Sequence, residues 1–592
     1  MNVIRTRGGS CGVRGWGAVA AVCGVAAMLA ASSAAGQAQS RKPSIRTAAN
    51  LVLLDVSVTN KKDRKPVRGL TENDFHLFED GKPQRVAIFR VDYAPAAPPP
   101  APAPLPAFTY TNLPAYHPAI GPLTVVLLDS LNTPLFDQDR MRMALVRYVA
   151  KLLEQGQRVA ILSLTDRLTM LQDFTTSRGL LLAAAKKFTP QESSQMGVRE
   201  DMTSSAKDNE YLDVLQMAKS CQNCAAMVEF YNTLKAMDRH ILTMNDEQRA
   251  EITADALDGI ASAFAGYPGR KSLIWISASF PPLYPGGPNF KLAWSAEEQL
   301  HHAADMLNAA RVTVYPVDPR GLIPDATPQP GVVGQQEIDQ QGRGDYYEST
   351  PDYYQSWDRL VRSPMYNLFS SQATMRTVAK ATGGVAFYNS NDIAHAITRA
   401  ASDAQGSYLI GYYPTNSDWN GKFRSIAVDL AEKGMTLRYR RGYYATPYFA
   451  RSIAKPKVAP SAQLQAALLD PLPATALTFR VYAPPPSPGA HAESAGQILL
   501  PGASVKLGAS CSLNVSFRVA AITPSGTIAA ERGSDVRRNF DAQQCATVRR
   551  GAIAFRYELP LKPGRYQLKF LVRDNRTAAL GRVDVPVNIG VP

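Results

Sequence analysis

The chain has 592 residues, of which 45% are hydrophobic and 19% charged, a composition typical of folded globular domains. This length predicts roughly three to four domains. The formal net charge is +14 at pH 7, but the basic residues are spread thinly, with small clusters at Arg438, Arg440 and Arg441 and at Arg549 and Arg550. The chain carries neither a basic stripe interleaved with aromatic residues nor a nucleic-acid-binding motif, so we exclude nucleic acid as a partner.

The first 38 residues have the pattern of a secretory signal peptide. Three Arg residues precede an apolar stretch over residues 16–31, and small residues then offer cleavage after Ala35 or Ala38. A transmembrane anchor is the alternative, but the stretch is rich in Gly and Ala and barely long enough to span a bilayer. We therefore expect an exported protein in the periplasm, the cell envelope or the extracellular space, with no membrane span after cleavage.

Residues 45–93 predict a small β module. The segment 51–59 has the partial alternation of a strand, and residues 75–91 predict a hairpin with Asp80-Gly81 as its turn. Residues 94–120 form a linker that begins with a run of Ala and Pro, which is stiff and extended.

From residue 121 to residue 445 the pattern alternates between strands and helices, which predicts an α/β domain with a doubly wound, mostly parallel sheet of Rossmann-like type. The expected strands are 124–128, 158–164, 272–277, 311–317, 384–388 and 408–413. The expected helices are 140–153, 178–188, 247–264, 296–310, 371–382 and 392–402. Two insertions, 191–239 and 322–363, interrupt the alternation.

The end of the chain predicts a second β domain. A Pro-containing linker covers residues 446–473, and short strands recur through residues 474–592 at the spacing of an immunoglobulin-like β-sandwich. Four cysteines follow the leader. We expect Cys511 and Cys545, within this domain, to bridge two strands or loops, and Cys221 and Cys224, in a C-x-x-C pattern, to form a local structural disulfide.

The segment from residue 121 to residue 444 resembles a von Willebrand factor type A domain, in the variant found in exported Acidobacterial proteins. The resembling phrases are VVLLDSLNT, FTTSRGLLLAAAKKF, PGRKSLIWISASFP, AARVTVYPVDPRGL, ATGGVAFYNSNDIAHAI and YLIGYYP, with LFEDGKPQRVAIF upstream and LRYRRGYYA downstream. The resemblance covers about two thirds of the chain. It implies protein–protein interaction at the carboxyl edge of the sheet.

Domains of this family normally carry a metal-ion-dependent adhesion site that begins with D-x-S-x-S. Here Asp129 and Thr133 match its first element, but Leu131 replaces the middle Ser and Asn132 is one position out of step. The resemblance places an Asp after strand 272–277, where the sequence has Ser277-Ala278-Ser279. Asp129 and Thr133 are thus the candidate ligands of Mg²⁺ or another divalent cation. A metal-free site, in which Asp129 caps its loop through backbone N–H groups, is the interpretation that we favour.

These patterns predict a non-enzymatic adhesion or scaffold protein with a degenerate metal site, whose protein partner contacts Asp129, Ser130, Asn132 and Thr133. Two alternatives remain open. One is a zinc-dependent hydrolase using Glu297, His301 and Asp305, which share one face of a helix, although H-E-x-x-H is missing. The other is a structural protein of cell-envelope assembly. Asp318, before Pro319, either lines the same crevice or forms a turn.

Overall fold

The computed structural model describes residues 51–93, 102–113, 123–195, 225–278, 290–322, 364–445 and 460–590, apart from short gaps and some helical side chains, together with isolated positions between these ranges. The expected leader (1–38), Cys221 and Cys224, and residues 323–363 lie outside this description. None of the described helices combines the length and the hydropathy of a membrane span.

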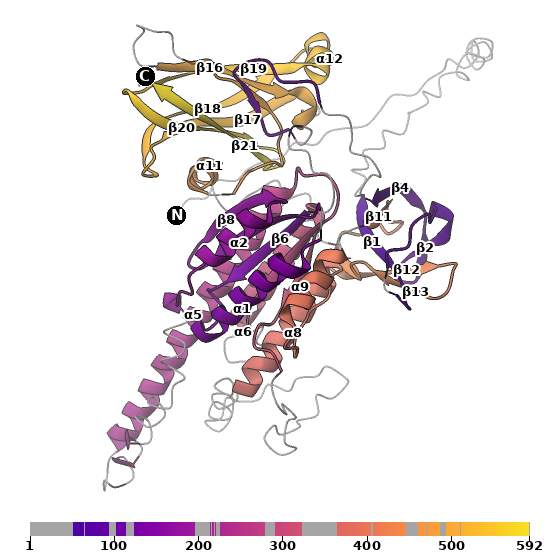
Figure 1. Cartoon of the computed structure of the whole chain (residues 1–592), viewed down its shortest axis with the longest axis vertical. Coiled ribbons are helices and arrows are strands. Elements are labelled where there is room, and N and C mark those ends of the chain that lie inside the picture. Colours follow the sequence, from indigo (N-terminus) through magenta and orange to yellow (C-terminus); the bar gives the residue numbers. More distant parts are fainter. Residues whose placement is uncertain are drawn as a thin grey trace, which may run out of the picture. The chain divides into compact units, whose positions relative to one another are not determined.

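A five-stranded sheet forms the centre of an α/β domain (Figure 1). Its strands, in spatial order, are β10 (Val312–Val317), β9 (Lys271–Ile276), β6 (Leu123–Asp129), β7 (Arg158–Leu164) and β8 (Leu168–Thr175). The first four are parallel and β8 is an antiparallel edge strand. β6 lies in the middle with all seven residues buried, as expected of a largely apolar strand that is covered on both faces.

Helices cover both faces of this sheet. One layer contains α1 (Leu135–Arg147), the π-helical segment η3 (Tyr148–Leu152), α2 (Arg178–Lys187) and α9 (Ile393–Ser402). The other contains α5 (Ala225–Phe264), α6 (Phe290–Ala309) and α8 (Pro364–Thr382). Val126 and Leu128 of β6 pack in the first layer, whereas Val125 and Leu127 pack in the second. The doubly wound α/β class predicted from the sequence is therefore confirmed for this domain.

Residues 51–93 pair with residues 406–445 in an N-terminal sandwich of two four-stranded sheets. One sheet contains β13 (Met435–Arg438), β1 (Val52–Asn60), β11 (Gly406–Tyr412) and β4 (Val86–Tyr93). The other contains β14 (Gly442–Tyr444), β12 (Phe423–Leu430), β2 (Phe75–Glu79) and β3 (Lys82–Gln84). The short helix η1 (Glu72–Asp74) precedes β2.

Two predictions are corrected here. The expected strand 408–413 is β11, which pairs antiparallel with β1 and β4 rather than joining the α/β sheet. The expected strand 384–388 makes only an isolated bridge, from Phe387 to Val317. β11 was misplaced because its apolar run is buried like a parallel strand, and periodicity does not identify a strand's partner. The Asp80-Gly81 turn is confirmed, since both residues have positive φ between β2 and β3.

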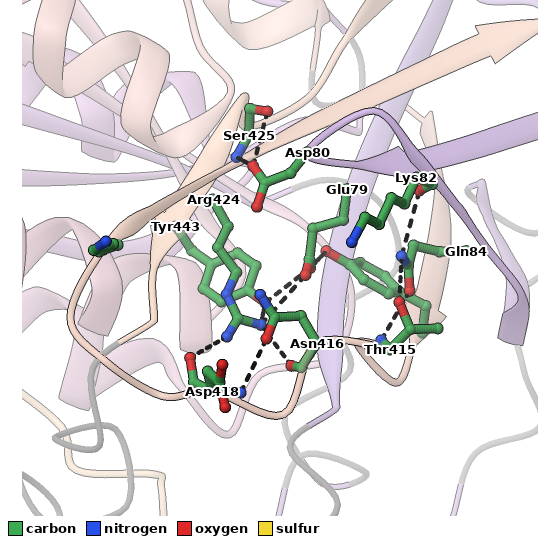
Figure 2. A network of polar contacts seen from close by, with 12 residues as sticks. Glu79, Asp80, Lys82, Gln84, Thr415, Asn416, Asp418, Arg424, Ser425 and Tyr443 are labelled. Carbon is green, nitrogen blue, oxygen red and sulfur yellow. Dashed lines mark hydrogen bonds and ion pairs between the residues drawn. The ribbon is translucent and has the colours of Figure 1, made fainter.

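A buried polar network joins the strands of the N-terminal sandwich (Figure 2). Glu79 Oε2 accepts hydrogen bonds from the hydroxyls of Tyr412 at 2.7 Å and Tyr443 at 2.8 Å. The Arg424 guanidinium lies 3.3 Å from Glu79 Oε1 and donates to the Asn416 carbonyl at 2.8 Å. Burial and the contact with Glu79 raise the pKa of both tyrosines. This network ties β2 to β11, β12 and β14.

Two further four-stranded sheets form a C-terminal β domain with a shared core. One contains β19 (Ala552–Pro560), β16 (Glu493–Pro501), β15 (Arg480–Tyr482) and β5 (Thr109–Thr111); the other contains β18 (Ile528–Asn539), β17 (Ser512–Ile522), β20 (Gly564–Asp574) and β21 (Leu580–Ile589). Its helices are α11 (Pro460–Leu469), η4 (Gly502–Ser504) and α12 (Ala542–Arg550). β5 comes from the expected linker, and Figure 1 shows its indigo trace among the yellow strands. A disulfide joins Cys511 to Cys545.

Candidate functional site

The loop between β6 and α1 lies at the carboxyl edge of the parallel strands, where open α/β sheets place their ligand sites. Asp129, Ser130, Asn132 and Thr133, the four residues predicted to contact a partner, are all fully buried. They are brought together, but they face the interior of the domain rather than its surface. A direct contact with a partner would require this loop to open.

The Asp129 carboxylate accepts hydrogen bonds from several directions. The Asn132 backbone N–H reaches Oδ1 at 3.0 Å, and Asn132 Nδ2 reaches Oδ2 at 2.9 Å. Trp275 Nε1, from β9, also donates to Oδ2 at 2.9 Å, and the Ser277 hydroxyl makes a further contact. Burial raises the pKa of Asp129, and these hydrogen bonds act in the opposite direction. The predicted loop cap is present, with the indole and the hydroxyl added from the neighbouring strand.

Asn132 connects this carboxylate to helix α5. Its Nδ2 donates to Thr253 Oγ1 at 2.9 Å, while its Oδ1 accepts from Arg249 Nε at 3.1 Å and from Arg249 Nη2 at 2.9 Å. Arg249 Nη1 pairs with Asp246 Oδ1 at 3.1 Å. Arg249 is completely buried, so Asp246 supplies the counter-charge that a guanidinium needs in a low-dielectric interior.

Thr133 and Gln138 hold the end of the loop that leads into α1. Thr133 Oγ1 accepts from the Ala278 backbone N–H at 3.1 Å, which joins the loop to the end of β9. Gln138 Nε2 donates to the carbonyls of Thr133 at 2.8 Å and Gln191 at 3.0 Å. The first residues of the insertion 191–239 therefore pack against the loop. The Ser130 hydroxyl is buried with no partner among the described residues.

These contacts do not fit a divalent cation. Mg²⁺ and Ca²⁺ need several oxygens with lone pairs directed at the ion. Here the oxygens of Asp129 and the Thr133 hydroxyl accept hydrogen bonds from N–H groups, and Asn132 Oδ1 already faces a cation. Within the described residues, no group of three or more His, Cys, Asp or Glu side chains could hold a metal. Asp129 and Thr133 are thus loop-holding residues in this arrangement.

Two apolar side chains are exposed beside the loop. α1 begins directly after it, and Leu135 and Phe136 are 46% and 79% exposed. On the same helix, Arg140 Nη1 donates to the Arg320 carbonyl. Leu322, 61% exposed, follows shortly after this contact. The buried loop therefore fixes the start of a helix whose first side chains point outward.

Asp318 is bonded by Arg320, two residues further along the chain. Its carboxylate accepts from Arg320 Nε at 2.9 Å and Nη2 at 2.7 Å, and from the Arg320 backbone N–H at 3.0 Å. The side chain is almost fully buried. Asp318 forms the turn after β10, and Arg320 contacts both of its carboxylate oxygens.

The candidate hydrolase residues lie on α6, where the side chain of Glu297 is outside the described residues. The His301 ring packs against Tyr444 with centroids 4.8 Å apart. Burial raises the pKa of Asp305 to about 6, and the nearby charges of Arg440 and His301 lower it. On this face of the helix, His301 therefore packs against an aromatic ring, and Asp305 lies near the charges of Arg440 and His301.

Four residues that complete the site were missed from the sequence: Asp246, Arg249, Thr253 and Trp275. The first three occur at i, i+3 and i+7 on α5, a spacing that places them on one helix face. The available signal was an Asp and an Arg three residues apart, which places a pair of opposite charges on one helix face. Nothing in the sequence indicates which loop that face contacts, because α5 and the loop are more than a hundred residues apart.

Replacing Thr253 by Val is expected to lower the free energy of unfolding by about 1 kcal/mol, because Asn132 Nδ2 loses one acceptor in a buried site. Thr377→Val is the matched control, since the Thr377 hydroxyl bonds only its own helix, to the Ala373 carbonyl. Denaturant unfolding of both variants measures the difference. Equal losses would mean that the Thr253 contact contributes nothing specific.

Asp258 on α5 gives a pH-dependent prediction. Burial, with a smaller contribution from Asp255, raises its pKa from 3.8 to about 7, and its Oδ2 lies 3.5 Å from His302 Nε2. The folded protein thus holds this proton more tightly than the unfolded chain, so stability falls as the pH rises from about 4 to about 7. Asp258→Asn removes that loss.

We therefore compare the stability of Asp258→Asn with that of the unmodified chain at two pH values. Between pH 5 and pH 8, the stability of the variant is expected to rise relative to that of the unmodified chain by about 1–2 kcal/mol, measured from the melting temperatures. Asp139→Asn is the control, because Asp139 is exposed and pairs only with Arg142. A pH-independent difference for Asp258→Asn would contradict the prediction.

The sequence matches no protein-family model and none of the curated proteins with which it was compared. Among solved structures it is similar to an aerotolerance-related membrane protein from Bacteroides fragilis, at 14% identity and a TM-score of 0.22, over 48% of this chain and 98% of that chain. BatB from Bacteroides thetaiotaomicron gives 13% identity and a TM-score of 0.21, over 48% and 98%. A von Willebrand factor type A protein from Catenulispora acidiphila gives 9% identity and a TM-score of 0.22, over 79% and 66%. At these scores the similarities carry no argument, and the fold rests on the strand order and pairing described above.

Proposed function

We propose that this chain is an exported, non-enzymatic adhesion or scaffold protein of the von Willebrand factor type A kind, in the Acidobacterial variant. It binds a protein partner at the carboxyl edge of the α/β sheet, next to a degenerate metal site. The observation that carries the proposal is the juxtaposition of a fixed, buried polar loop with the exposed Leu135 and Phe136. Exposed aromatic side chains on a rigid support are the usual anchors of protein interfaces.

Several features support the remaining parts of the proposal. The Cys511–Cys545 disulfide is compatible with an oxidising compartment, so we place the protein in the periplasm, the cell envelope or outside the cell. The leader at 1–38 and the immunoglobulin-like class of the last domain belong to the same proposal. Residues 191–195 pack beside the loop, so the insertion that they begin contributes to the choice of partner.

The test is site-specific photo-cross-linking in the producing cell. Phe136 is replaced by benzoylphenylalanine, and the control places the same group at Met143, which is 67% exposed on the same helix. A discrete adduct from position 136, absent from position 143 and reduced by Leu135→Asp, supports binding at this surface. An adduct with a second copy of the chain would favour the assembly protein instead. No adduct specific to position 136 would refute the proposed surface.

A further inference from the structure

Arg249 is a fully buried cation that contacts Asn132 in the loop after β6. It lies on α5, with Asp246 three residues before it and Thr253 four residues after it. These three side chains share one helix face. Arg249 and Thr253 contact Asn132 in the loop after β6, and Asp246 contacts Arg249. A buried guanidinium is costly unless it is paired and hydrogen-bonded, so its retention here requires a defined set of partners.

Two of the Arg249 nitrogens donate to the same oxygen. Both Nε and Nη2 of Arg249 donate to Asn132 Oδ1, at 3.1 Å and 2.9 Å, and Nη1 is neutralised by Asp246 at 3.1 Å. The planar fork of Arg holds the Asn132 amide in a single orientation. In that orientation the Asn132 Nδ2 group is directed at Asp129 Oδ2 and Thr253 Oγ1, both at 2.9 Å.

The network then continues into the sheet. Asp129 Oδ2 also accepts from Trp275 Nε1 of β9 at 2.9 Å. One unbroken path therefore runs from Asp246 through Arg249, Asn132 and Asp129 to Trp275, linking α5, the loop and β9. A divalent cation in an adhesion site would join the same loop to its neighbours through oxygen ligands. Here a guanidinium joins them through N–H donors.

We propose that the Arg249 guanidinium is a built-in cation that fixes the 129–133 loop in place of a divalent metal ion. Arg249 is thus a positioning residue: it acts through Asn132 on the loop and, through the loop, on the start of α1. The role of Arg249 in holding the loop is independent of the proposed function. Its role in presenting Leu135 and Phe136 to a partner rests on the proposed function. The expected consequence is a site whose conformation is independent of added metal.

Chemical rescue tests this proposal on the full chain. Arg249→Ala leaves space next to Asn132 Oδ1 and Asp246, and free guanidinium ion is the probe that fits it. Urea, a neutral molecule of the same shape, is the matched control. Trp275 reports the state of the loop through the ¹⁹F resonance of 5-fluorotryptophan, assigned with Trp275→Phe. Millimolar concentrations of both compounds are used, far below those that denature proteins.

We expect Arg249→Ala to melt about 5–10 °C lower than the unmodified chain and to shift the Trp275 resonance. Guanidinium should restore both in a saturable way, while urea and NaCl should not. Equal effects of guanidinium and urea would overturn the proposal. So would saturable binding of Mg²⁺ or Mn²⁺ to the unmodified chain with a change at Trp275.

Arg249→Lys covers the case in which the Ala variant does not fold. It keeps the charge but loses the fork, so the Trp275 resonance should shift while the chain stays folded. An unchanged resonance in a folded Lys variant would contradict the positioning role. Cross-linking from position 136 separates the two proposals. Rescue by guanidinium without an adduct specific to position 136 would support the role of Arg249 and refute the proposed binding surface.

Discussion

Replacing Arg424 by Met is expected to lower the free energy of unfolding of the N-terminal sandwich by about 3–5 kcal/mol. Glu79 and Arg424 are both buried, and the change leaves the carboxylate with two tyrosine hydroxyls and no cation. The carbonyl of Asn416 also loses its guanidinium donor. Arg424 lies 5.1 Å from the centre of the Trp419 ring, so a cation–π contact is lost as well.

Hydrogen exchange of the full chain, followed by mass spectrometry, measures this effect locally. Peptides from β2 and β12 should exchange faster in Arg424→Met, while peptides from β17 in the C-terminal β domain should not change. The double variant Glu79→Gln/Arg424→Met removes both charges and should recover more than half of the loss, because a buried neutral pair carries no uncompensated charge. A single variant as protected as the unmodified chain would show that the ion pair does not support the sandwich.

Removing the Cys511–Cys545 disulfide is expected to lower the stability of the C-terminal β domain by about 4 kcal/mol in the chain-entropy model. The two cysteines are 34 residues apart, so the bond closes a long loop that includes β17, β18 and part of α12. Without it the unfolded chain gains conformational freedom. Cys511→Ala/Cys545→Ala should therefore unfold at a lower denaturant concentration, observed by exchange in β17 and β18.

The unmodified chain in reducing agent is the control for this variant. Once the bond is reduced, its unfolding midpoint should approach that of the double Ala variant. Peptides of the five-stranded sheet, which contains neither cysteine, should be unaffected in both samples. A reduced chain with the unfolding midpoint of the oxidised one would show that the bond adds nothing to the stability of the domain.

Local sequence patterns predicted the elements whose structure depends on neighbours in the chain. The apolar run of β6 predicted a central strand, and the two-residue Asp80-Gly81 loop predicted a hairpin, because in each case a few adjacent residues decide the outcome. The edge strand β8 was missed. Its residues are mostly half-buried and follow neither strict alternation nor an apolar run, which are the two patterns that identify strands.

The sequence by itself determined the α/β class, the position of Asp129 at the end of the central strand, and the likeness of its loop to an adhesion site. Only the tertiary structure decided that β11 belongs to the N-terminal sandwich, that β5 joins the C-terminal sheet, and that Arg249 meets Asn132. The physical reason is the same in each case. Strand pairing and buried side-chain hydrogen bonds join residues separated by more than a hundred positions. Periodicity along the chain indicates that a residue is buried, but not which other residues it contacts.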